Sequence, residues 1–243
     1  MNTINTINTI NTTLTDLPLF PLQSVLFPGG LLPLQIFEVR YLDMIGKCHK
    51  AGTPFGVVCM TQGREVRQRE GGAKTPAAAA SPTAEAAAKP KGEGFANEAF
   101  HSVGTLAKIT QFERPQPGLM VVRCTGTLRF HIESSQQLPH GLWVAQAHTL
   151  PADPELDVPE DLAHVRHALQ QLMIGIEQQL QGADLPIQKP HMWSDCGWLA
   201  NRWCELLPLS AEVKQRFMSL DSPLLRLELV SDALDQIGFK LPG

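Results

Sequence analysis

Two pairs of histidine and cysteine residues are spaced so that they could do chemistry. His164 and His167 lie three residues apart in a segment with helical periodicity, so their rings could share one face. Cys196 and Cys204 lie eight residues apart on one face of another expected helix. A zinc site needs about four ligands at short, characteristic spacings, and neither pair has further ligands at such spacings. We therefore expect solvent-facing histidines, packed cysteines and no metal site.

Catalytic nucleophiles also lack their usual sequence contexts. A hydrolytic serine needs a base and an orienting group, and the sequence contains neither a G-x-S-x-G nor an S-x-x-K motif. Its glycines form no G-x-x-x-x-G-K-[ST] loop, which would supply the backbone cradle and lysine for ATP phosphates. We expect a protein that is not an enzyme and needs no cofactor. One alternative stays open, an enzyme whose site is dispersed, because acids distant in sequence can meet in space.

Other chemically capable residues have simpler interpretations. Glu38 and Arg40 flank the start of an expected helix and could recognise a peptide, but a helix-dipole contact and a surface ion pair explain them as well. The tryptophans could form a binding platform, although helical spacing of the last two favours core packing. They are Trp143, Trp193, Trp198 and Trp203.

Bulk properties exclude several classes of protein. The 243 residues carry a net charge of −4, so no electrostatic argument favours nucleic acid or an anionic membrane. No apolar run approaches the roughly 20 residues that span a bilayer. The start, MNTINTINTINTTLTD, lacks the features of a signal peptide, and five cysteines without close pairs argue against a disulfide framework. We expect a cytoplasmic protein without a membrane partner.

Hydrophobic periodicity predicts strands first and helices afterwards. Short apolar runs between prolines precede a turn at Phe27-Pro28-Gly29-Gly30, and helical spacing begins at Phe37 and continues through Tyr41, Met44, Ile45 and Cys48. Residues 115–118 predict a hairpin turn. In residues 127–132, Leu128, Phe130 and Ile132 alternate with Arg129 and His131, which predicts a strand with its apolar face inward.

Composition breaks divide the chain into three parts. Residues 1–15 are a low-complexity lead-in that we expect to be disordered, and residues 16–150 form the β domain with a mobile, Ala- and Pro-rich insertion at 71–94. Residues 151–243 read as a helical bundle. Its apolar stripes run from Leu162 to Leu180 and along three later helices, for which Asp195 or Ser194, Ser210 and Ser222 are candidate N-caps.

Several motifs in the expected order resemble one known family. LPLFPLQSVLFPGGLLPLQIFEVRY at residues 17–41, VGTLAKI at 103–109, MVVRCTGTLRFHI at 120–132 and WLANR at 198–202 are similar to the Lon substrate-binding domain, the N-terminal domain of Lon proteases. The resemblance implies an α+β fold, a PUA-like small β-barrel with one amphipathic helix followed by a C-terminal α-helical bundle. The sequence ends at Gly243 without ATPase or Ser–Lys protease motifs, so it implies a stand-alone Lon-domain protein.

The same resemblance implies a non-enzymatic module that binds exposed apolar or flexible polypeptide segments and is linked to protein quality control. Unfolded polypeptides would be its partners, together with a protease or chaperone, and the oligomeric state stays open. Because a receptor for unfolded chains should recognise apolar side chains and not one particular sequence, we expect an exposed apolar patch near the turns. The expected contributors are Phe27, Leu31, Leu32, Phe112 and Met120. An RNA-binding module is the remaining alternative, since PUA-like barrels are often associated with RNA.

Overall fold

The first part of the chain is a sheet that closes into a ring. The computed structural model describes residues 11–62, 98–180, 187 and 189–239. The described strands follow the order β1-β7-β6-β5-β3-β4; a parallel pairing of β1 with β3 closes the ring, and β2 pairs with β6. The strands are β1 (Thr13–Leu22), β2 (Leu31–Ile36), β3 (Phe55–Gln62), β4 (Ala99–Phe100), β5 (Val103–Gln116), β6 (Leu119–Gln137) and β7 (Trp143–Thr149).

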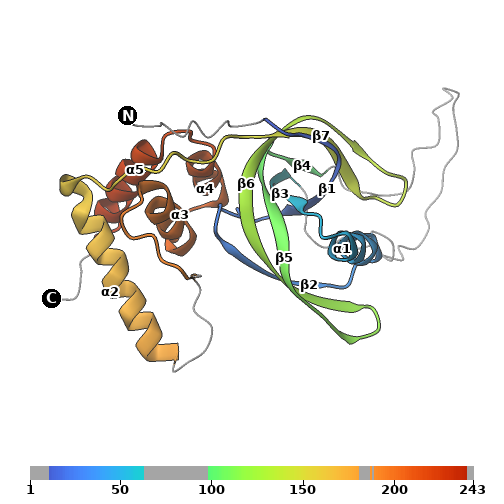
Figure 1. Cartoon of the computed structure of the whole chain (residues 1–243), viewed down its shortest axis with the longest axis horizontal. Helices are drawn as coiled ribbons and strands as arrows, with labels where there is room; N and C mark the ends of the chain where they lie inside the picture. Colours follow the sequence, from blue (N-terminus) through green and yellow to red (C-terminus); the bar gives the residue numbers. More distant parts are fainter. Residues whose placement is uncertain (1–10, 63–97, 181–186, 188, 240–243) are drawn as a thin grey trace, which may run out of the picture.

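Helices lie at both ends of this near-barrel (Figure 1). Helix α1 (Val39–Ala51) follows β2 directly and packs at one end, with Tyr41, Met44, Ile45 and Cys48 buried as predicted. At the other end lie α2 (Ala163–Leu180), α3 (Cys196–Leu206), α4 (Ala211–Met218) and α5 (Pro223–Gln236), after a 3₁₀ turn at Glu160–Leu162. The predicted α+β class, a PUA-like barrel followed by helices, is confirmed. None of the described helices is both long and apolar enough to cross a membrane.

Side-chain caps start the last three helices where the sequence predicts. Asp195, Ser210 and Ser222 each accept a hydrogen bond from the backbone N–H three residues further on, which satisfies a donor that lacks an intrahelical partner. Pro223 then occupies the first turn of α5, where a missing N–H costs nothing. The predicted hairpin is also confirmed, because β5 and β6 join at Pro117-Gly118 and Gly118 adopts a φ of 80°.

The predicted alternation in β6 is wrong at two residues. Leu128 is 41% exposed, whereas Arg129 is only 4% exposed. The cause is a β-bulge: Thr105 pairs with Arg129 but Ala107 pairs with Gly126, so β6 carries one extra residue opposite β5. The bulge turns Arg129 toward the C-terminal helices, where its Nη1 donates to the carbonyls of Met218 and Leu220 at 3.1 and 2.9 Å.

Among the described residues, three apolar clusters hold the fold together, and the smallest lies around Phe130 in the ring. The other two are larger. One fills the ring beneath α1 and includes Tyr41, Ile45 and Phe55. The other lies among the C-terminal helices around Trp203, and the ring contributes Phe27 to it. Because Phe27 is fully buried there, the expectation that it lies unburied near a turn is wrong; Met120, 8% exposed, is likewise part of the ring core.

The N-terminal boundary also differs from prediction. β1 begins at Thr13, which pairs with His148 of β7, so the lead-in assigned to residues 1–15 is too long at its end. The insertion at 71–94 lies outside the described residues.

Candidate functional site

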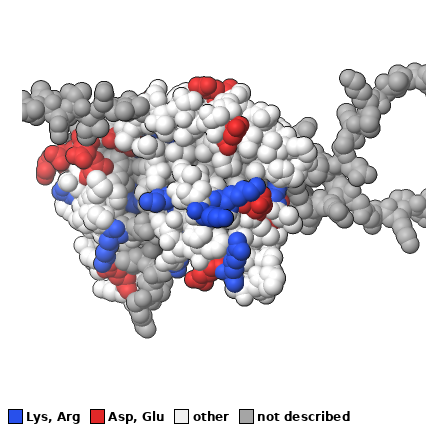
Figure 2. All heavy atoms as spheres, turned by 45° about the vertical axis from the view of Figure 1, so that its right-hand side comes forward, with Lys and Arg blue, Asp and Glu red and all other residues white. Residues whose placement is uncertain are grey.

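Charge is divided unevenly along the chain. Residues 151–243 contain 7 Lys and Arg against 14 Asp and Glu, whereas residues 1–150 contain 13 against 10. Figure 2 turns one side of the ring forward and shows Lys and Arg side chains in a band across the middle of that face. The acidic excess of the whole protein therefore belongs to its helical part.

Helix α1 and the β5–β6 hairpin lie beside each other on the ring. The ring of His49 in the last turn of α1 stacks on the ring of Phe112 in β5, with centroids 4.2 Å apart and planes within 4°. One and two turns earlier, Gly46 and Leu42 lie on the same side of the helix, which follows from spacings of three and four residues. This side of α1 therefore faces the hairpin, while the adjacent stripe fills the ring core.

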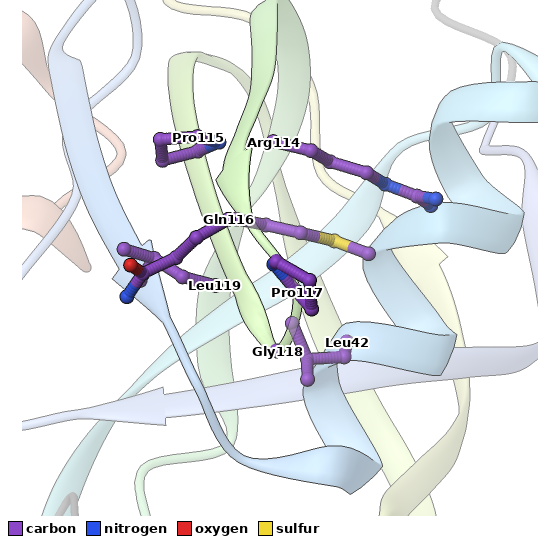
Figure 3. A pocket seen from close by; sticks show the side chains of 8 residues that line it. Leu42, Arg114, Pro115, Gln116, Pro117, Gly118 and Leu119 are labelled. Carbon is purple, nitrogen blue, oxygen red and sulfur yellow. The ribbon is translucent and has the colours of Figure 1, made fainter.

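A groove opens between α1 and the hairpin tip (Figure 3). We call it the α1 groove; it has a volume of about 440 Å³. Apart from Arg114 and Gln116, its side chains are apolar, and Figure 3 shows Arg114 extending from β5 toward α1. The groove is lined by Leu42, Arg114, Pro115, Gln116, Pro117, Gly118, Leu119 and Met120.

Arg114 holds a defined position along this groove. Its guanidinium carbon lies 5.2 Å from the centre of the Phe112 ring, within the range of a cation–π contact. A Cβ atom at residue 46 would lie 3.4 Å from Arg114 Nη2, so the missing side chain of Gly46 gives the guanidinium room against the helix. No carboxylate among the described residues pairs with Arg114.

Exposed apolar side chains continue the surface beyond the groove. Phe37 and Val39, at the junction of β2 and α1, are 55% and 81% exposed. Phe37 also lines a second hollow of about 230 Å³ with Pro33, Leu34 and other residues of β2. Prediction placed Phe37 on the buried stripe of the helix, which is wrong because Glu38 has an extended backbone and the helix starts only at Val39.

The other edge of β2 is poorly suited to pair with another strand. Gly126 N–H donates to Gly30 C=O, and alternation along an antiparallel pair then directs the backbone groups of Leu31, Pro33 and Gln35 away from β6. In the described part of the chain, β2 pairs with β6 alone. Pro33 has no N–H to offer at the middle of this edge, so added strands would lose a ladder hydrogen bond there.

The five residues predicted for binding do not form one surface. Phe27 lies in the helical core, and Met120 lies at the floor of the α1 groove. Phe112 is half-buried beside that groove, in contact with His49 and Arg114. Leu31 and Leu32 line a different hollow, where the ring meets the helices. Val39, Leu42 and Arg114 were not predicted from the sequence, although Val39 is a large apolar residue outside the buried stripe of the helix.

This junction hollow, about 380 Å³, contains titratable groups with shifted pKa values. Burial raises the pKa of the Glu205 carboxyl to about 7, although Arg202 and Lys214 oppose that rise. Burial also lowers the pKa values of Arg202 and Lys214. Such groups suggest a dispersed catalytic site, but each has a structural contact that accounts for its position.

Those contacts join the two parts of the chain. Arg202 of α3 donates to the carbonyls of Gly29 and Pro28, at 2.5 and 2.8 Å, and pairs with Glu205 at 2.9 Å. Lys214 donates to the backbone carbonyl of Glu205 at 3.2 Å. The cluster therefore fastens the turn after β1 to the helical part.

The remaining candidates serve structure. His164 and His167 are exposed, as expected. Cys196 and Cys204 are fully buried, and burial raises their thiol pKa values to about 11 and 12. Across the described ranges, no three His, Cys, Asp or Glu side chains gather as metal ligands.

Arg40 and the tryptophans also contribute mainly to packing. The expected surface ion pair is wrong, because Arg40 is buried and bonds Glu38, Glu98 and the carbonyl of Gly141. Trp203 is a core residue, whereas Trp143 lies on β7 and donates a hydrogen bond to Glu98. Trp193 and Trp198 pack edge to face at 5.1 Å, so the four rings form no shared platform.

Comparisons with known proteins agree with this architecture. The model of the ATP-dependent protease La (LON) substrate-binding domain matches residues 16–236, and the match does not include an ATPase or protease module. No curated protein matches the chain. A crystal structure of a Lon N-terminal domain protein from Xanthomonas campestris is 25% identical, with a TM-score of 0.64, and the match covers 90% of this chain and 98% of that one.

A second solved structure is similar in fold. The N-terminal domain of Mycobacterium avium complex Lon protease matches with 16% identity and a TM-score of 0.53, over 95% of this chain and 100% of that one. With a family match across residues 16–236, the chain belongs to the Lon substrate-binding domain family.

Proposed function

We propose that this protein is a non-enzymatic module that binds exposed apolar or flexible segments of other polypeptides through the α1 groove and the adjoining Phe37 and Val39. The observation that carries the proposal is the exposure of these two large side chains, 55% and 81%, beside a groove with mostly apolar walls. Apolar surface gathered in this way is typical of interaction sites. A partner protease or chaperone would receive the bound chain.

The shape of the surface favours side-chain recognition of an extended chain. The groove is open to solvent, and two prolines and a glycine of the hairpin tip line it. Pro33 disfavours strand addition at the neighbouring β2 edge, so affinity would come from apolar contacts more than from a backbone ladder. Such contacts suit partner segments that are all apolar but differ in sequence.

The groove also supports a binding role over a catalytic one. Arg114 is the only titratable side chain that lines it, and an arginine stays protonated at ordinary pH. General acid–base catalysis needs a group whose pKa lies near the working pH. The residues with shifted pKa values lie instead at the junction hollow, where they hold the two parts of the chain together.

Binding of unfolded casein to surface variants tests the proposal. We expect the double variant F37S/V39S to weaken binding of fluorescein-labelled casein at least about fivefold in fluorescence anisotropy, because burying each side chain contributes roughly 1 kcal/mol or more. The control is I174S/L225S, which changes two exposed apolar residues, 46% and 43% exposed, in the helical part. Equal binding by wild type and F37S/V39S, or an equal loss in the control, would refute this assignment.

A further inference from the structure

We propose that the α1 groove selects apolar polypeptide segments that also carry carboxylates, with Arg114 as the residue that recognises them. The inference rests on the polypeptide-binding function above and specifies its substrate class. It starts from a guanidinium that lies along an apolar groove and pairs with no carboxylate among the described residues. A chain that enters the groove would lie within reach of its donors.

The guanidinium is held in place before any ligand binds. Phe112 lies beneath it at 5.2 Å, His49 stacks on Phe112, and Gly46 leaves space for Nη2 against α1. Arginine presents its N–H donors as a planar fork that matches the two oxygens of a carboxylate. Because the fork is already positioned, less side-chain entropy is lost when a carboxylate binds.

The surroundings strengthen this preference. Lys50 in the last turn of α1 is exposed and pairs with no carboxylate in the described part of the chain. Lys108 is exposed on β5, the strand that also carries Arg114. Helix α1 and strand β5 carry one acid each, Asp43 and Glu113, and Asp43 is already paired with Lys47. On one face of the ring, Figure 2 shows Lys and Arg side chains in a band, although the net charge of the protein is −4.

A nucleic acid would satisfy the same charges but not the rest of the surface. Single-stranded RNA is held by aromatic rings on which successive bases stack. Phe112 already contacts His49 and Arg114, and the groove walls are proline, leucine and methionine. An acidic, apolar polypeptide therefore fits both the walls and the charge.

Three labelled peptides of equal apolar content provide the test. Each is an unstructured 15-mer with the same leucines, phenylalanines and prolines, and its polar positions are all Glu, all Gln or all Lys. We expect wild-type protein to bind the Glu peptide about three- to fivefold more tightly than the Gln peptide, the gain of one exposed ion pair, and the Lys peptide most weakly. The preference should shrink as salt is added.

Two arginine variants separate recognition from general charge. R114Q should lower the ratio of Glu-peptide to Gln-peptide affinity at least about twofold, while R216Q, at an exposed arginine of α4, should leave that ratio unchanged. Equal affinity for all three peptides, or a ratio that survives R114Q, would overturn the charge selection while leaving polypeptide binding in place. No binding of any peptide would overturn the proposed function itself. Displacement of the Glu peptide by a 15-nucleotide single-stranded RNA at micromolar concentration would assign the groove to nucleic acid and overturn the inference.

Discussion

Replacing Asp153 with asparagine should destabilise the fold more than its position in a connecting segment suggests. The Asp153 carboxylate bonds both terminal nitrogens of Arg226, at 2.6 and 3.2 Å, and lies 3.6 Å from Arg129 Nη2. The side chains of both arginines are almost fully buried, 1% and 4% exposed. Asp153 is therefore the anion that balances two buried cations where the ring meets the helices.

The size of the effect follows from what each arginine retains. Arg226 keeps acceptors on Asn201, Phe217 and Leu220, and Arg129 keeps two backbone carbonyls and the exposed Asp221. Asparagine supplies one oxygen but turns an NH₂ group toward a guanidinium. Removing one partner of a buried ion pair costs about 3–5 kcal/mol, and the retained acceptors place D153N near 3 kcal/mol. At about 2–4 °C per kcal/mol, the melting temperature should fall by roughly 6–12 °C.

Urea and thermal unfolding, followed by circular dichroism, measure this loss against a matched control. Asp43 forms an ion pair with Lys47 at 2.7 Å, but the two side chains are 61% and 77% exposed. D43N should therefore cost less than about 1 kcal/mol. A D153N loss no larger than that of D43N would refute the idea that burial makes this network important.

Two further predictions concern titration and packing. Because burial raises the pKa of Glu205 to about 7 from 4.5, the folded protein binds more protons than the unfolded chain between these values, and the free energy of unfolding should fall as pH rises through that window. E205Q should remove about 2 kcal/mol of the decline between pH 5 and pH 8 in urea titrations; an unchanged pH dependence would contradict this. G104A should cost more than about 2 kcal/mol, because its Cβ would lie 2.4 Å from the carbonyl oxygen of Val57, while G175A, with open space around it in α2, should stabilise by about 0.5–1 kcal/mol. Equal melting temperatures for these two variants would refute the packing argument.

Features set by neighbouring residues could be predicted from the sequence. The caps at Asp195, Ser210 and Ser222 act on an N–H only three residues away, so the local pattern contains all the information. The hairpin turn at Pro117-Gly118 is local in the same sense.

Features that depend on residues distant in sequence could not be predicted in this way. Phe27 follows the pattern of an exposed turn, yet it is buried. Arg202, which lies 173 residues after Gly29, donates to the carbonyls of Pro28 and Gly29 and holds this turn against the helical part. The bulge in β6 depends on the register with β5, which no window of the β6 sequence contains. Leu128 and Arg129 therefore exchanged their expected environments.

The α1 groove escaped prediction for a related reason. Its walls come from α1 and from a hairpin about 70 residues later, so no single motif contains it. A surface that binds apolar chains must also use the residue types of a core, and hydrophobic patterning assigns such residues to the interior. Phe37 was placed on the buried stripe by that rule, although helix α1 begins two residues later. Once the start of the helix is known, Phe37 and Val39 are large apolar residues that the fold leaves 55% and 81% exposed, and we propose that a partner chain buries them.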